Sequence, residues 1–195
     1  MFADVVHSMD IAAAVGPERL CEIMADLVER SAAVVKRYGG TVDKFTGDGL
    51  MAVFGAPVAL ENHAFRACLT ALAVQETVKE LATGVQRRDL IDLTVRVGLN
   101  SGEVIAGEIG SGSLGYTAIG EHVGASQRME SPAPAGGVML SSSTARLVED
   151  LAVLSGTEMV DIKGATDPVP ARRLIGAVAH GERIGRPVSA LVGRE

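Results

Sequence analysis

The stretch 41–54 constrains the fold of this chain more than any other. Two strand-like runs, 41–45 and the apolar 50–54, flank the tetrapeptide Thr46-Gly47-Asp48-Gly49. Apolar runs of this length are typical of strands, and glycines beside an acidic residue supply the positive φ angles of a tight turn. The stretch therefore predicts a β-hairpin, and any fold for this chain must contain antiparallel strands.

Helices and further strands alternate around this hairpin. Residues 17–38 carry apolar side chains at helical spacing and stop at a glycine pair, which predicts a helix. Apolar and polar residues alternate over 93–99, which predicts a strand with one buried face, and we expect 104–109 to pair with it. The glycine-rich stretch 110–115 is predicted to be a loop. Further helices are predicted over 60–83, 121–131 and 144–150, and further strands over 2–6, 116–119, 138–140, 159–162 and 169–175.

This order of elements predicts an α+β fold: a ferredoxin-like-derived sandwich in which helices pack on one side of a mostly antiparallel sheet. A length of 195 residues suits one domain, to which we assign residues 1–178. Periodicity is lost after about residue 180, so 179–195 is interpreted as a linker or tail. The final residues 189–195 resemble the opening of an AAA-type NTPase domain. They are either the start of a truncated following domain or a chance match in a tail.

The charge pattern argues against several classes of partner. The net charge is −6 and no basic run is present, which disfavours nucleic acids and membrane surfaces. The longest apolar stretch, 49–60, contains glycine and proline and is too short to span a bilayer, and the first residues lack a signal-peptide pattern. We therefore expect a cytoplasmic protein. Cys21 and Cys68 form no CxxC pair and are predicted to be buried, reduced thiols.

Two acidic residues at strand ends are the first candidates for chemistry. Taken alone, Asp48 is a turn former and Asp4 is a helix N-cap. Taken together, they suggest hard oxygen ligands for Mg²⁺ or Mn²⁺, placed beside backbone amides that enter a helix and can hold phosphate oxygens. Two such ions can activate an attacking oxygen and stabilise a leaving one. The amides in question belong to Val5, Val6, His7, Ser8 and Met9.

Five separated motifs resemble those of class III nucleotidyl cyclases. The segments 2–6 and 43–55, which read FADVV and DKFTGDGLMAVFG, are similar to the family's two metal-site motifs. The string VGLNSG at 97–102, followed by Ala106-Gly107, resembles its core strand and hairpin. The segment 116–131 resembles its purine and transition-state segment, and DIKG at 161–164 resembles the segment with a phosphate-binding lysine. The resemblance runs in order from residue 2 to about 176.

The resemblance implies a homodimeric enzyme of signal transduction, with two sites across a head-to-tail interface. One chain supplies Asp4, Asp48, Val5 as a further metal ligand, and the amides that follow Asp4. Two Mg²⁺ or Mn²⁺ ions would bind in each site. The other chain supplies Lys44, Thr117, Arg128 and Lys163. Of these, Arg128 would stabilise charge on the phosphoryl oxygens and Lys163 would hold the terminal phosphates.

The base-reading pair favours adenine. Lys44 can only donate a hydrogen bond and the Thr117 hydroxyl can accept one, which matches N1 and N6 of adenine. Threonine at this place resembles one subclass of adenylyl cyclases. The function implied is the conversion of ATP to 3′,5′-cyclic AMP and pyrophosphate.

One departure leaves a second interpretation open. Four residues before its arginine the family usually has an asparagine that orients the ribose, whereas this chain has Gly124. Loss of one such bond in a transition state costs about 2.7–4 kcal/mol in well-studied enzymes, so weak activity is expected. The alternative is a degenerate cyclase-homology domain that dimerises and binds nucleotide as a regulatory module.

Overall fold

The computed structural model describes residues 1–108 and 116–178. The predicted loop over 110–115 and the predicted tail over 179–195 lie outside these residues. Within the described part of the chain, no helix is long and apolar enough to cross a membrane.

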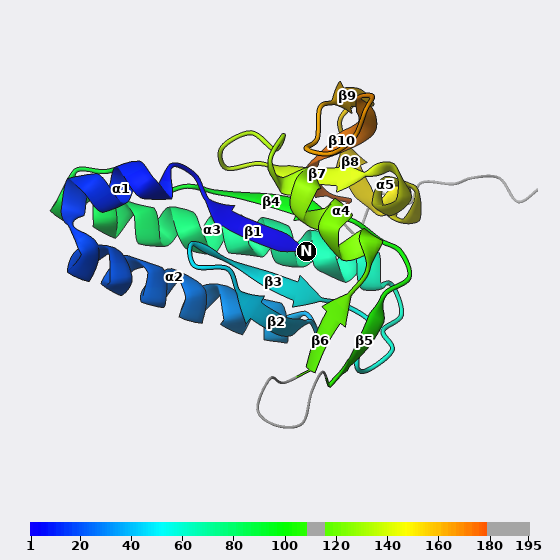
Figure 1. The fold of residues 1–195 in the computed structure, drawn as a ribbon, viewed down its shortest axis with the longest axis horizontal. Coiled ribbons are helices and arrows are strands. Elements are labelled where there is room, and N and C mark those ends of the chain that lie inside the picture. The colour runs from blue at the N-terminus through cyan, green and yellow to red at the C-terminus, as the bar shows by residue number, and fades with distance from the viewer. Residues whose placement is uncertain (109–115, 179–195) are drawn as a thin grey trace, which may run out of the picture.

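An eight-stranded sheet forms the centre of the domain (Figure 1). Its order is β2-β3-β1-β4-β7-β10-β8, and β9 pairs with β10. Only β4 and β7 pair in parallel, and the other neighbouring strands are antiparallel. The predicted α+β fold with a mostly antiparallel sheet is therefore confirmed. The strands of this sheet are β1 (Phe2–Val5), β2 (Thr41–Phe45), β3 (Gly49–Val53), β4 (Val95–Leu99), β7 (Val138–Ser141), β8 (Ala152–Leu154), β9 (Glu158–Val160) and β10 (Val169–Ala177).

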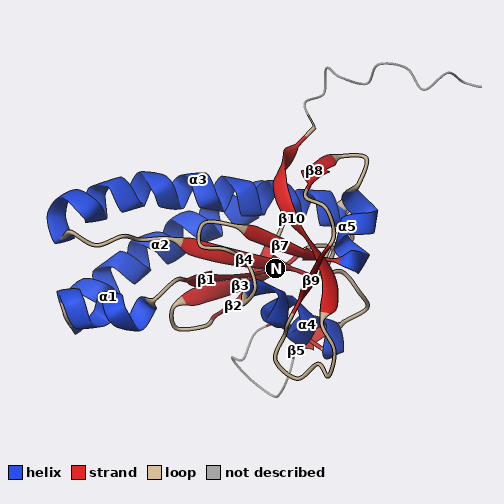
Figure 2. Ribbon diagram, turned by 90° about the horizontal axis from the view of Figure 1, so that it is seen from above, coloured by secondary structure: helices blue, strands red, loops and turns tan. Residues whose placement is uncertain are grey.

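Helices cover both faces of the sheet, which corrects the prediction of helices on one side. Apolar residues at alternate strand positions, such as Ala3, Leu50 and Val97, pack against α2 and α3. Figure 2 shows α4 on the side of the sheet opposite α3. The cause is Gly98: a β-carbon there would lie 2.5 Å from the carbonyl oxygen of Ser126, so only glycine allows α4 to approach β4 this closely. The helices are α1 (Ser8–Val15), α2 (Pro17–Arg37), α3 (His63–Asp89), α4 (Glu121–Glu130) and α5 (Ser142–Val148).

A separate two-stranded arm projects from the sheet beside β2 (Figure 1). It consists of β5 (Ile105–Glu108) and β6 (Tyr116–Ile119). The prediction that 104–109 pairs with 93–99 is therefore wrong. The chain leaves the sheet at Asn100, whose side chain donates to the carbonyl oxygen of His122 and accepts from Ser143. These bonds to α4 and α5 direct the following residues away from β4.

Two other predictions need correction. Helix α3 continues to Asp89 because Val85 is buried, and Arg19 holds Asp89 through a hydrogen bond of 2.7 Å between Nη2 and Oδ2. Cys68 is buried as predicted, whereas Cys21 lies on the exposed face of α2.

Candidate active site

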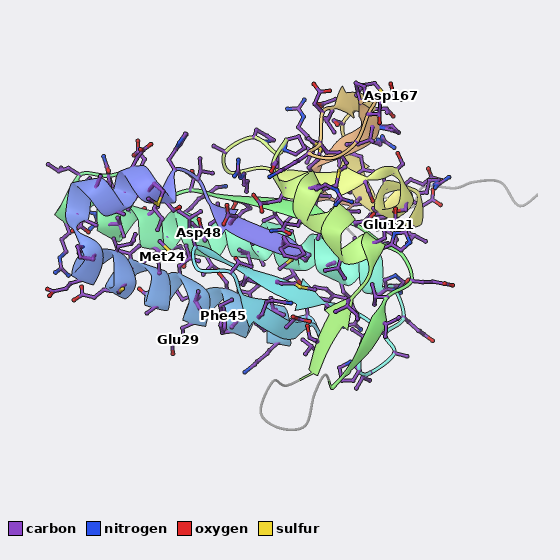
Figure 3. The ribbon with its side chains drawn as sticks, viewed as in Figure 1. Met24, Glu29, Phe45, Asp48, Glu121 and Asp167 are labelled. Atoms are coloured by element: carbon purple, nitrogen blue, oxygen red, sulfur yellow. The ribbon has the colours of Figure 1, made fainter. Side chains whose placement is uncertain are left out.

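The carboxyl groups of Asp4 and Asp48 lie together where β1 meets the turn between β2 and β3. Strand β1 pairs with β3 so that Asp4 faces Gly49, and the amide of Val5 donates to the carbonyl oxygen of Asp48 at 3.0 Å. The hydroxyl of Ser8 donates to Oδ2 of Asp48 at 2.7 Å. Figure 3 labels Asp48 at this end of the hairpin, beside the start of α1. The two predicted acidic residues are thus neighbours in one chain.

The two carboxyl groups share a hydrogen bond, and their pKa values move apart. Burial raises the pKa of Asp4 to about 7, and the hydrogen bond with Asp48 and the charge of Glu130 act in the same direction. Burial also acts to raise the pKa of Asp48, but hydrogen bonds from Asp4 and Ser8 outweigh it and hold this pKa below its ordinary value. Asp4 is therefore the carboxyl group of the pair that takes up a proton more readily, and Asp48 is the one that stays ionised.

This donor set fits a divalent cation of the Mg²⁺ or Mn²⁺ type. Both side chains offer hard carboxylate oxygens, and a cation would offset the burial and the neighbouring negative charges that raise the pKa of Asp4. No group of three or more His, Cys, Asp or Glu side chains with metal-binding geometry occurs among the described residues. The protein thus supplies two carboxylates, which matches Mg²⁺ sites that keep waters and substrate phosphates as remaining ligands.

A basic residue that was not predicted lies beside this pair. The Arg96 side chain on β4 contacts Glu130 through Nε and Oε1 at 2.7 Å, and its Nη2 lies 3.6 Å from Oδ2 of Asp4. The pairing of β1 with β4 puts Asp4 opposite Arg96. The alternation over 93–99 already placed Arg96 on the face opposite Val95 and Val97, and this is the signal that could have found it.

The predicted phosphate cradle is smaller than expected. The amide of Val5 donates to Asp48, and the amide of Val6 donates to the carbonyl oxygen of Thr94 at 2.9 Å. Both amides are therefore used inside the fold. No partner is found within the described residues for the amides of His7, Ser8 and Met9, where α1 begins. These three amides remain available to an anion.

The predicted base-reading pair comes together around a third residue, Asp43. The Thr117 hydroxyl on β6 donates to the Asp43 carboxylate at 2.9 Å, and the amide of Ala118 donates to its Oδ2 at 2.6 Å. The ammonium group of Lys44 lies 3.4 Å from Oδ1 of the same carboxylate. The Asp43 side chain is 2% exposed, whereas that of Lys44 is 51% exposed. Asp43 was not singled out from the sequence.

The other two predicted cations lie elsewhere in the chain. Arg128 is on α4 with its guanidinium against Gly124, and Lys163 is exposed in the segment between β9 and β10. Within the described residues, neither side chain makes a hydrogen bond or ion pair. No such bond joins the Asp4–Asp48 pair to the group around Asp43 either. One chain therefore holds two separate groups of predicted site residues.

A cavity of about 370 Å³ borders the group around Asp43 through Ala118. Its lining includes Phe54, His63, Asn100 and His122, and it includes none of the predicted site residues.

Comparison with known proteins gives consistent relatives. The family described as "Adenylate and Guanylate cyclase catalytic domain" matches residues 1–171. Adenylate cyclase 1 of Rhizobium meliloti is 31% identical over 131 residues, which are 67% of this chain and 20% of that protein. The membrane guanylyl cyclase of Dictyostelium discoideum is 28% identical over 148 residues, which are 75% of this chain and 10% of that protein. The chain thus spans a fifth or less of these two relatives.

Solved structures of both kinds of cyclase resemble the fold. The guanylyl cyclase Cya2 has a TM-score of 0.86 and 29% identity, with 93% of this chain and 92% of that chain covered. The adenylyl cyclase CyaB from P. aeruginosa has a TM-score of 0.83 and 26% identity, with 94% of each chain covered. These likenesses do not distinguish between the two bases.

Proposed function

The chain belongs to the family of adenylate and guanylate cyclase catalytic domains, and on that premise we propose that it forms 3′,5′-cyclic AMP and pyrophosphate from ATP. The reaction would occur in a head-to-tail homodimer with two equivalent sites. The observation that carries the proposal is the adjacent pair Asp4 and Asp48: two partly buried carboxyl groups need positive charge nearby to be ionised together. A nucleotide with its cations supplies that charge.

The state of the single chain supports a dimer. Arg128 and Lys163 find no polar partner among the described residues, although the proposed chemistry needs cations near the phosphates. Large apolar side chains are exposed on β2 and on the arm: Phe45 is 56% exposed and Ile105 is 74% exposed. A two-fold interface would bury such side chains and bring the cations of one chain to the carboxylates of the other.

Asp4 and Asp48 would hold Mg²⁺ or Mn²⁺, with Val5 as a proposed third ligand. When bound, such ions lower the pKa of the ribose 3′ hydroxyl and offset the charge of the phosphates. The 3′ oxygen then forms a bond to the α-phosphorus, the bond from that phosphorus to the bridging oxygen breaks, and pyrophosphate leaves. The proton of the 3′ hydroxyl passes to solvent.

The remaining proposed residues bind charge and orient the substrate. The amides of His7, Ser8 and Met9 can donate to phosphate oxygens at the start of α1. Arg128 of the other chain would stabilise the charge that develops on the α-phosphoryl group, and Lys163 would hold the terminal phosphates. Ser8 also keeps Asp48 in place through its hydroxyl.

A cyclic AMP assay with Mn²⁺-ATP over a range of protein concentrations tests this function. Specific activity should rise with protein concentration, because the monomer lacks a complete site. The matched control is Asp48→Ala, which removes one of the two carboxylates. If the wild type and the control give the same background, the chain is not an active cyclase.

A second function is favoured by Gly124, which has no side chain to orient the ribose. On that interpretation the domain dimerises and binds nucleotide but turns over little. Nucleotide binding by calorimetry with no product above the Asp48→Ala background would select this alternative.

A further inference from the structure

We propose that Asp43 is a positioning residue that fixes the Thr117 hydroxyl as a hydrogen-bond acceptor and thereby makes the site select a 6-amino purine. The inference rests on the proposed function, because it concerns the base-reading part of the same site. In this proposal Asp43 does not contact the base; it acts through Thr117, which does.

The local backbone brings Asp43 to this position. The pairing of β2 with β3 shifts register between Val42 and Lys44, so Asp43 is an extra residue at a β-bulge. In a regular strand, neighbouring side chains point to opposite faces, whereas a bulge re-aims them. Here the Asp43 carboxylate reaches β6 and is still 3.4 Å from the ammonium group of Lys44.

Two hydrogen bonds and one ion pair converge on the buried carboxylate: the hydroxyl of Thr117 and the amide of Ala118 donate to it, and the ammonium group of Lys44 lies 3.4 Å away. An ionised carboxylate can only accept hydrogen bonds. The amide of Ala118 cannot turn away, because β6 is paired with β5. The side chain is 2% exposed, so water does not compete for its oxygens. Asp43 is therefore held in one orientation.

The hydrogen bond to Asp43 determines which groups of the Thr117 hydroxyl remain for a ligand. A hydroxyl has one proton to donate and two lone pairs that accept. The proton goes to Asp43 at 2.9 Å, so only lone pairs remain for a ligand. Adenine presents an amino group at position 6, which such a lone pair accepts. Guanine and hypoxanthine present an oxygen there, and two acceptors facing each other leave a polar group without a partner.

Without Asp43, threonine would not discriminate in this way, since its hydroxyl can rotate to donate to an oxygen at position 6. The preference would thus come from the pair Asp43 and Thr117 rather than from Thr117 alone. Lys44, which is half-exposed, contributes its own donor to position 1 of the purine.

The test compares kcat/KM for ATP with that for inosine triphosphate, which differs from ATP only at positions 1 and 6. In Asp43→Asn, the side-chain oxygen of the asparagine accepts from the Ala118 backbone amide, so its amino group faces Thr117. The Thr117 hydroxyl then accepts from that amino group, and its own proton becomes free to donate to the base. We expect the ratio of kcat/KM for ATP to kcat/KM for inosine triphosphate to fall about tenfold. This is the effect of losing one hydrogen bond to the amino group while relieving one unpaired acceptor. In a Thr117→Val background the same substitution should leave the ratio unchanged.

Thr117→Val alone provides a second measurement, in case Asp43→Asn does not fold by circular dichroism. If Asp43 fixes the hydroxyl as an acceptor, this variant loses efficiency with ATP and not with inosine triphosphate. Equal losses with both nucleotides, in either variant, would overturn the role of Asp43. A wild type that makes no cyclic AMP, or that prefers GTP, would instead overturn the proposed function.

Discussion

The guanidinium group of Arg128 lies against Gly124, one turn earlier in α4: a β-carbon placed on Gly124 would be 3.1 Å from Nη1 of Arg128. The arginine thus occupies the space next to the position where relatives are expected to have an asparagine. Any side chain at Gly124 moves Arg128 by a few tenths of an ångström, which a flexible side-chain end can accommodate.

Replacing Gly124 by asparagine should raise turnover with Mn²⁺-ATP. A new side-chain amide beside Arg128 can orient the ribose by a hydrogen bond. In other enzymes, one hydrogen bond of this kind in the transition state changes kcat by about 10²–10³. We expect a gain of about tenfold or more, measured as kcat at saturating ATP.

Gly124→Ala is the matched control for this change. It displaces Arg128 in the same way and adds no amide. It should stabilise the helix by about 0.5–1 kcal/mol without raising kcat. If asparagine and alanine give equal turnover, another group already orients the ribose.

Removing Arg96 should destabilise the domain, because Glu130 and Asp4 both lie near its guanidinium. Arg96→Met leaves a nearly buried carboxylate without its partner, and we expect a loss of about 1–3 kcal/mol in the free energy of unfolding, measured with urea. The double variant Arg96→Met with Glu130→Gln should recover much of this loss, because it also removes the uncompensated charge of Glu130. A double variant as unstable as the single one would show that the ion pair is not the cause.

The two cysteines should differ in reactivity. Burial raises the pKa of the Cys68 thiol to about 12, so this thiol stays protonated at pH 8.5, whereas Cys21 is exposed. Alkylation requires the thiolate. Iodoacetamide should therefore label native protein once, at Cys21, and label urea-unfolded protein twice, as counted by mass spectrometry. Native Cys21→Ser should remain unlabelled; rapid labelling of that variant would mean that Cys68 is not buried as described.

The hairpin and its acidic turn could be predicted because their signals are local. Glycines flank Asp48, strand-like runs flank the glycines, and β6 has the predicted bounds. The grouping of Asp48 with Asp4 followed from their positions at strand ends and was supported by the family resemblance, and the pairing of β1 with β3 agrees with it.

The features of the fold and the site that were not predicted depend on contacts between segments distant in the sequence. Asp43 contacts Thr117, which lies 74 positions away in the sequence, and this contact depends on a β-bulge that no local sequence pattern predicts. The position of α4 depended on the close approach at Gly98, and a glycine in a strand does not indicate which helix approaches it. Strand β8 was not predicted from the sequence.

Complementation between two inactive variants tests the central claim most directly. Asp48→Asn removes a carboxylate from the half of the proposed site that one chain would supply, and Arg128→Ala removes a cation from the half that its partner would supply. Each variant alone should make no cyclic AMP above background. Mixed in equal amounts and allowed to exchange subunits, they should recover about a quarter of wild-type activity, because half of the dimers are mixed and each has one intact site. A mixture as inactive as its components, after exchange is verified, would contradict a site shared head-to-tail between two chains.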